Sequence, residues 1–151
     1  MTRFTTCALL ITLGAALGCE SSHPHSDVLE VRAADVEPRT GWTETARFIG
    51  GSEVWMAPEA VVDTSMVSEA RAAVDHHGAN VVMIRLDSDG SSALAELTAR
   101  QETRPIAVLI RGEVVATPLI LTQLDEEFVI SRPDWSMDDA RAFAQAVNGD
   151  S

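Results

Sequence analysis

The hydrophobic pattern is most distinctive between Pro105 and Pro118, where two apolar runs rich in β-branched residues flank the dipeptide Arg111-Gly112. Runs of this kind around a two-residue turn that ends in glycine predict a β-hairpin with a type I′ turn. Such a turn needs positive φ at both central residues, which glycine adopts without steric cost, so Gly112 is the expected structural turn residue. The sequence therefore predicts a hairpin over residues 106–117.

The register of this hairpin follows from its turn. Leu109 then pairs with Val114 and Val108 with Val115, so both faces of the ribbon carry apolar side chains. A ribbon that is apolar on both faces is typical of a position inside a sheet. We therefore expect the hairpin to be central in its sheet, with the flanking prolines ending its ladder.

Two segments have the periodicity of helices. The last begins at Ser136, an N-cap with Asp139 three residues later, which is an acidic variant of the capping box. Its apolar positions recur at the spacing i, i+3, i+4 and i+7: Ala140, Phe143, Ala144 and Val147. An earlier helix is expected over residues 92–100, with Asp89 or Ser91 as its N-cap.

Further strands are expected where short apolar runs lie between turn residues: 27–34, 53–56, 80–86 and 128–131. Residues 43–49 are ambiguous. Residues 64–75 fit a helix by their alanine content, or a turn followed by a strand. Together the elements predict an α+β fold, in which a mixed or antiparallel sheet with a central hairpin (106–117) carries two helices packed on one face.

Composition and charge narrow the class of protein. The chain has 151 residues, of which 46% are hydrophobic, and this suits one compact domain with appendages. Its formal net charge of -12 repels nucleic acid and anionic headgroups, so nucleic acid is excluded as a partner. The two cysteines, Cys7 and Cys19, both lie near the N-terminus, so no disulfide framework holds the body of the protein.

Residues 1–18 have the pattern of an export signal, because Arg3 precedes a short apolar run. The segment 16–19, Ala-Leu-Gly-Cys, resembles the lipobox of bacterial lipoproteins, and this resemblance implies that Cys19 is acylated and becomes the new N-terminus. Residues 19–27 then form a flexible polar tether to the membrane. The alternative is an ordinary cleaved signal peptide in which Cys19 is incidental.

The lipoprotein interpretation predicts a location in the bacterial cell envelope, with the body of the protein facing the periplasm or the exterior. Cleavage removes Arg3, so the mature net charge becomes -13, from ten Arg against 23 Asp and Glu.

No metal site is expected from the four histidines. His23 and His25 lie on the tether, where two ligands without further partners make a weak site. His76 and His77 are adjacent, so their side chains diverge, and a solvated turn is the better interpretation.

Catalytic residues and a cofactor site are also not predicted. Residues 87–90 begin like a calcium loop, but its twelfth position, where an acidic ligand is needed, is Thr98. The sequence has no recognisable nucleophile–base pair, paired carboxylate site or Gly-rich phosphate loop. We therefore expect a protein that is not an enzyme.

The order of elements from residue 54 to 148 is strand, turn and strand, strand, helix, hairpin, strand, helix. Short motifs mark this order: 68–71 before a loop ending in Gly78, 86–97 around Gly90, 105–110, 112–115, Pro118 and 139–141. In this order and spacing the chain resembles the head subdomain in the first periplasmic loop of SecD, the membrane subunit that assists protein export. The resemblance implies a SecD head-like domain over 54–149, preceded by an N-terminal strand and loops over 28–53, and implies that 69–74 is strand.

Four features depart from that family. SecD carries a series of transmembrane helices, which this sequence lacks, and its hairpin turn is usually Asp-Gly, whereas this turn is Arg111-Gly112. An acidic stretch at 123–127 replaces a glycine pair, and residues 132–135 replace a glycine before the last helix. In the translocase the head is thought to contact emerging preprotein, and the resemblance implies that such contact persists here without a motor.

The sequence thus predicts a lipid-anchored, non-catalytic envelope module that binds polypeptide or another envelope protein and is linked to protein export. The alternative is a structural or small-molecule-binding envelope lipoprotein that reuses the SecD head fold, because a fold does not fix a function. The expected binding surface is the exposed side of the sheet.

Overall fold

The computed structural model describes residues 28–49, 52–124 and 126–149. Its elements in chain order are β1 (Leu29–Asp35), β2 (Thr43–Ile49), β3 (Ser52–Met56), β4 (Val62–Asp63), the 3-10 helix η1 (Thr64–Met66), β5 (Val67–Val74), β6 (Asn80–Leu86), α1 (Ser88–Arg100), β7 (Ile106–Ile110), β8 (Glu113–Ala116), β9 (Glu127–Ser131) and α2 (Met137–Asn148). The predicted α+β class is confirmed, and the strand pairs among these elements are antiparallel.

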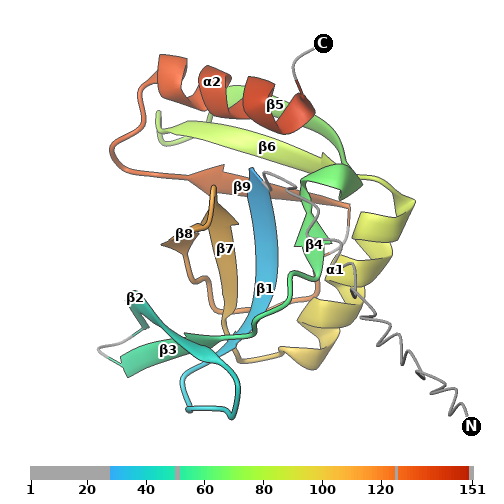
Figure 1. The fold of residues 1–151 in the computed structure, drawn as a ribbon. Helices are drawn as coiled ribbons and strands as arrows, with labels where there is room; N and C mark the ends of the chain where they lie inside the picture. Colours follow the sequence, from blue (N-terminus) through green and yellow to red (C-terminus); the bar gives the residue numbers. More distant parts are fainter. Residues whose placement is uncertain (1–27, 50–51, 125, 150–151) are drawn as a thin grey trace, which may run out of the picture.

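The strands form two sheets, where the sequence pattern predicted one. The first has the order β2-β3-β1-β7-β8, with β4 paired to β1, and the second has the order β5-β6-β9 (Figure 1). In the first sheet β1 lies between β3 and β7, with Val31 opposite Val108. The N-terminal strand, which was expected to lie outside the head-like domain, is therefore hydrogen-bonded to a strand of that domain. β2, at one end of the first sheet, also contacts β8 at the other end.

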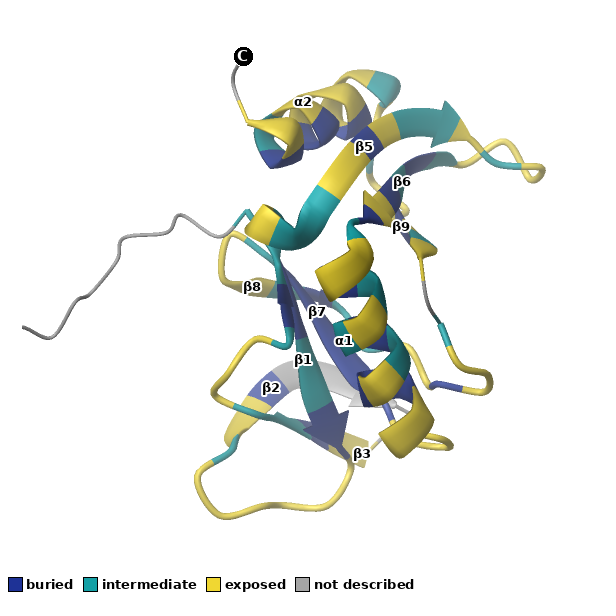
Figure 2. Ribbon diagram, turned by 90° about the vertical axis from the view of Figure 1, so that its right-hand side faces the viewer, coloured by how far each residue is buried: buried dark blue, intermediate teal, exposed yellow. Residues whose placement is uncertain are grey.

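The second sheet carries α2. Ala70 of β5 pairs with Ile84 of β6, which pairs in turn with Phe128 of β9. Figure 2 shows α2 turning its buried positions towards this sheet and its exposed positions towards solvent. The segment 69–74 is strand, as the resemblance implied, and residues 43–49, which were ambiguous, form β2.

The hairpin is formed by β7 and β8, but it is not central. Leu109 pairs with Val114 as predicted, and then a bulge at Val115 shifts the ladder, so Val108 pairs with Ala116 and not with Val115. β8 is the last strand in the order of its sheet. The prolines also do not end the pairing, because Pro105 forms a bridge to Leu119.

The two helices begin at side-chain caps. Ser136 and Asp139 form the predicted capping box of α2, with the amide N–H of Asp139 donating to Ser136 Oγ at 3.1 Å. α1 begins four residues earlier than predicted, because Asp87 is its N-cap and accepts from the amide N–H of Gly90 at 2.8 Å. Gly90 lies so close to η1 that a Cβ there would come within 2.9 Å of Met66 Cβ.

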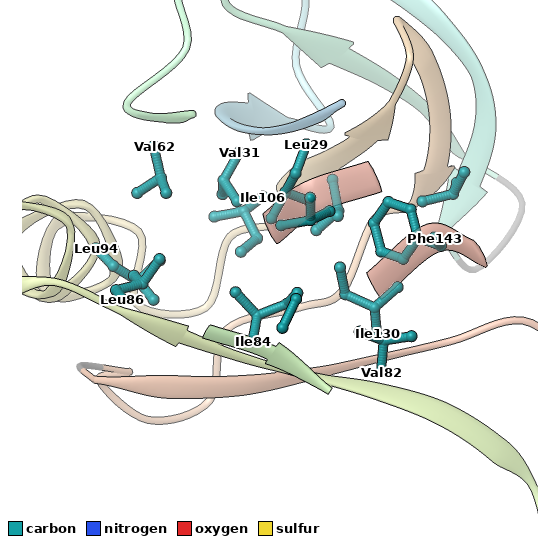
Figure 3. Close-up of a cluster of buried hydrophobic side chains, with 14 of the residues drawn as sticks. Leu29, Val31, Val62, Val82, Ile84, Leu86, Leu94, Ile106, Ile130 and Phe143 are labelled. Carbon is teal, nitrogen blue, oxygen red and sulfur yellow. The ribbon is translucent and has the colours of Figure 1, made fainter. Parts of the chain in front are cut away.

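One hydrophobic core joins both sheets and both helices. Figure 3 shows Leu29, Val31 and Ile106 of the first sheet facing Ile84 and Val82 of the second, with Leu94 of α1 and Phe143 of α2 at its sides. A second, smaller cluster lies on the other face of the first sheet and contains Ala34, Val54, Ala107 and Leu109. In the described part of the chain, neither helix is long and apolar enough to cross a membrane.

Candidate functional site

The site residues expected from the sequence lie in different places. Cys19 and the tether histidines lie outside the described residues. Gly112 is in the β7-β8 turn with φ 79°, beside Arg111 with φ 49°, which is the backbone of a type I′ turn. The amide N–H of Arg111 donates to the carbonyl of Val28 at 3.0 Å, so this turn is fixed against the start of β1.

His76 and His77 belong to the turn between β5 and β6, which is held by a carboxylate. Asp75 accepts hydrogen bonds from the amide N–H groups of Ala79 and His77, both at 2.9 Å. The bond from Ala79 contributes most to lowering the pKa of Asp75 below its usual value. Among the described residues, no group of three or more His, Cys, Asp or Glu is placed to hold a metal ion.

A groove of about 470 Å³ lies between the two sheets and was not predicted from the sequence. It runs between β7 and β9 and is closed on one side by the segment that follows β8. Its lining contains no charged side chain: Val31, Leu94, Ile106, Val108, Ala116, Pro118, Leu119, Ile120, Leu121, Thr122, Leu124, Phe128, Val129, Ile130 and Ser131. An apolar concave surface of this volume is typical of a binding site.

The segment after β8 is held in place at both ends. At its start, the amide N–H of Ile120 donates to the carbonyl of Arg104 at 3.0 Å, and the side chain of Ile120 is buried. At its end, the amide N–H of Leu124 donates to the hydroxyl of Thr98 at 3.0 Å. Thr98, which the calcium-loop comparison singled out, is thus a buried residue of α1 that anchors the groove wall.

The edge of the groove carries exposed apolar side chains. Among the described residues, five large apolar side chains are strongly exposed, and three of them line the groove: Leu119 at 45%, Leu121 at 73% and Val129 at 54%. We call these three residues the apolar rim. Exposed apolar residues that gather at one place mark interaction sites, whereas single ones need no explanation.

One end of β9 is electronegative. Arg85 on β6 is shared by Glu127 at 3.2 Å, Glu69 at 3.5 Å and Glu126 at 4.0 Å, so one cation faces three carboxylates and the cluster has a net charge of -2. These groups are substantially exposed, so the pairs add little to folding stability. The carboxylates outnumber the cation, so this end of β9 carries an excess of negative charge.

A buried carboxylate, that of Asp35, lies at the C-terminal end of β1. Burial alone would raise the pKa of Asp35, but hydrogen bonds from Arg39 and the Glu37 amide, with the charges of Arg39 and Arg104, lower the pKa below its usual value. Arg39 also lies over the ring of Trp42, 5.1 Å from its centroid. This cluster is structural, because each charge in it already has a partner.

The fold and the groove define a class of protein: an antiparallel α+β module with an apolar groove between its two sheets. A family model, the P1 head subdomain of SecDF, matches residues 42–151, and the chain belongs to this family. The P1 head subdomain is a non-catalytic module of the translocase.

Three relatives place the family match in context. The chain is 32% identical over 65 residues to the protein translocase subunit SecD of Acidaminococcus fermentans, an alignment that covers 43% of this chain and 16% of that protein. It is also similar to a structure of SecDF, described as a membrane component that enhances protein export, with a TM-score of 0.63 at 18% identity over 81% of this chain and 62% of the other. SecDF in a super-membrane-facing form gives a TM-score of 0.64 at 18% identity, over 82% of this chain and 19% of the other.

The likeness to the solved structures shows the fold alone, because the identities are low. The chain spans less than a fifth of the SecD subunit that it matches.

Proposed function

We propose that this protein is a lipid-anchored, non-catalytic module of the bacterial envelope that binds an extended apolar polypeptide segment in the groove and thereby assists protein export. The observation that carries the proposal is the uncharged groove with three exposed apolar residues on its rim. Membership of the SecDF P1 head family supports it, since this subdomain is periplasmic in SecDF.

The rim supplies the affinity. Full burial of a side chain such as Leu121 stabilises a complex by about 1.5–3 kcal/mol, so two or three such contacts suffice for weak, reversible binding. A weak and reversible complex suits a polypeptide that passes the site and leaves it again.

The charge of the protein selects among segments. A mature net charge of -13 repels acidic polypeptides and attracts basic ones. Exposed charges act mainly on the association rate and are screened beyond about 8 Å at physiological ionic strength. We therefore expect a basic, unfolded peptide to bind at low salt and to lose most of its association rate at high salt, while an acidic peptide of equal hydrophobicity does not bind.

The anchor is Cys19 in this proposal. One acyl chain holds a protein to a membrane only marginally, but the several chains of a lipoprotein hold it stably. Replacing Cys19 with serine should release the protein from membranes or block its processing. A Cys19→Ser variant that is still processed and still membrane-bound would contradict the anchor.

The site is tested with two matched variants. Leu121→Gln removes an apolar side chain from the rim, while Val74→Gln removes one that is 57% exposed at the end of β5. With the full-length protein in phospholipid nanodiscs, Leu121→Gln should weaken binding of the basic peptide about tenfold, and Val74→Gln should not change it. Equal effects of the two variants would show that the peptide does not bind in the groove.

A small-molecule-binding lipoprotein is the second candidate, because a volume of about 470 Å³ also suits a small apolar ligand. In that case peptides of every charge should fail to bind the folded protein, while a small apolar dye should bind and be lost in Leu121→Gln.

A further inference from the structure

The direction of the backbone hydrogen bonds in the second sheet can be fixed from one side chain. Asn148, at the end of α2, accepts from the amide N–H of Ala70 at 2.7 Å and donates to the carbonyl of Ala70 at 2.9 Å. Both backbone groups of Ala70 therefore point away from β6. Ala70 and Ile84 are then a non-hydrogen-bonded pair of the antiparallel ladder.

This alternation passes across the sheet to β9. Since the backbone groups of Ile84 do not bond to Ala70, they point to the other neighbour, where Ile84 lies opposite Phe128. The same phase is seen two residues further on, where the amide N–H of Leu86 donates to the carbonyl of Glu126 at 2.9 Å. The N–H and C=O groups of the alternate residues, Glu127, Val129 and Ser131, therefore point away from β6.

These groups form an open edge beside the groove. Within the described residues β9 pairs with β6 alone. Val129 and Ser131 line the groove, and Glu127 and Val129 are exposed. An edge strand that presents its backbone groups in this way is a template for pairing with another extended chain.

We propose that the polypeptide in the groove binds as an added β-strand, hydrogen-bonded to the edge of β9 at Glu127, Val129 and Ser131. The inference rests on the proposed function, and it adds the mode of binding and the pattern of the bound segment. An added strand lies about 4.8 Å from β9 and continues its pleat, so its side chains alternate between the two faces of the sheet.

The two faces require different side chains. On the inner face the added strand continues the row of Phe128 and Ile130, which line the groove, so these positions take apolar residues. On the outer face it continues the row of Glu127 and Val129, next to the cluster around Arg85 with its net charge of -2. Val129 borders the groove because it lies at the edge of β9, while its side chain lies on this outer face. An opposite charge across a strand pair is favourable, so the outer positions take Arg or Lys. The bound segment is therefore an extended stretch in which apolar and basic residues alternate.

The experiment uses a labelled peptide with alternating valine and arginine over about six residues, matched to the five residues of β9. Its backbone amides are methylated one at a time, and the affinity of each peptide for the full-length protein in nanodiscs is measured. In an added strand every second amide donates to β9 and the others point away. Methylation should thus weaken binding about tenfold at alternate amides and leave it nearly unchanged at the amides between them.

A pair of protein variants tests the same contact from the other side. Val129→Pro removes an outward N–H without removing a bond to β6, whereas Val129→Thr keeps the N–H and also loses the apolar side chain. Val129→Pro should bind the unmodified peptide several-fold more weakly than Val129→Thr. If Val129→Pro does not fold, the methylated peptides on the unchanged protein decide the question.

Three outcomes would overturn the inference. Binding with no alternation along the methylated peptides would leave the proposed function in place and exclude the added strand. No binding of the unmodified peptide to the folded protein would remove the proposed function itself. Self-association that Leu121→Gln abolishes would show that a second copy occupies the groove.

Discussion

The second sheet has two edge strands, β5 and β9, and their backbone groups have different surroundings. At β5 the side chain of Asn148 bonds to both backbone groups of Ala70, and the adjacent groove of about 390 Å³ is lined partly by polar residues, including Arg71 and Arg141. At β9 no such side chain bonds to the edge within the described residues, and the adjacent groove of about 470 Å³ has no charged lining. The grooves are similar in volume and differ in chemistry.

This difference indicates which edge is used. Proteins cover or charge the strand edges that must not pair, because an open edge invites aggregation. At β5 the side-chain amide of Asn148 gives that protection without an additional strand or loop. An open edge beside exposed Leu119 and Leu121 carries a risk of aggregation, and such exposure is typical of a binding site.

The largest expected effect is on folding stability, at the turn of the β7-β8 hairpin. Gly112 has φ 79° in the turn of the β7-β8 hairpin, and nothing lies within 4 Å of where its Cβ would be, so only backbone strain opposes a substitution. Gly112→Val should lower the free energy of unfolding by about 1–3 kcal/mol and the melting temperature by several degrees. An unchanged melting curve would mean that the turn is wrongly placed.

The next effect concerns the protected edge. Asn148→Ala removes both hydrogen bonds to Ala70 and should lower the free energy of unfolding by about 1–2 kcal/mol, because each bond contributes about 0.5–1.5 kcal/mol and alanine favours the helix slightly. It should also increase aggregation, measured by light scattering. Gln145→Ala, on the same helix, is the control. Equal stability and solubility of the two variants would show that the amide does not protect β5.

A smaller effect is expected at the anchor of the open groove. Thr98→Val keeps the shape of the side chain but removes the acceptor of the Leu124 N–H. It should cost about 1 kcal/mol in stability and also weaken peptide binding, since the segment after β8 is then held at one end only. Thr40→Val, at an exposed loop position, should change neither quantity. If Thr98→Val lost stability but kept its affinity for the peptide, the hydrogen bond between Leu124 and Thr98 would stabilise the fold without contributing to binding.

The smallest expected effect compares two side chains that hold the backbone in place, the charged carboxylate of Asp35 and the neutral amide of Asn148. The folded pKa of Asp35 is lowered from 3.8, so its contribution to stability is complete above the unfolded pKa and is lost as the pH falls through the folded pKa. Its partners Arg39 and Arg104 are 41% and 48% exposed, so the contribution is modest. Asp35→Asn should therefore be less stable than the unchanged protein at pH 7, with a difference that shrinks below about pH 4. The cost of Asn148→Ala should not depend on pH, because the amide does not titrate.

Local features could be predicted from the sequence because their causes are local. The dipeptide Arg111-Gly112 determines its turn, and Ser136 with Asp139 determines the start of α2. The N-cap of α1 was harder to assign, since Asp87, Asp89 and Ser91 all have capping side chains, and the close packing of Gly90 on Met66 favours the earliest.

Features that depend on packing could not be predicted in this way. The hairpin is apolar on both faces because each face meets a different core cluster, one with Val108 and one with Leu109, and not because it is central in its sheet. The bulge at Val115 has no sequence signal, since a slip of one residue keeps both faces apolar. The groove could not be predicted either, because it forms only where the two sheets pack against each other. Its one visible sign was the apolar run 119–124, which has no strand partner in the sequence pattern.

Whether the polypeptide binds in the groove can be measured with a photo-crosslinking amino acid at position 121 or, separately, at position 74 in the full-length protein. Each variant is irradiated with the labelled peptide of alternating valine and arginine. Binding in the groove between the two sheets predicts strong crosslinking from position 121 at the groove rim and only background crosslinking from position 74 at the end of β5. Crosslinking from position 74 alone, or equally from both positions, would contradict the claim that the polypeptide binds in the groove between the two sheets.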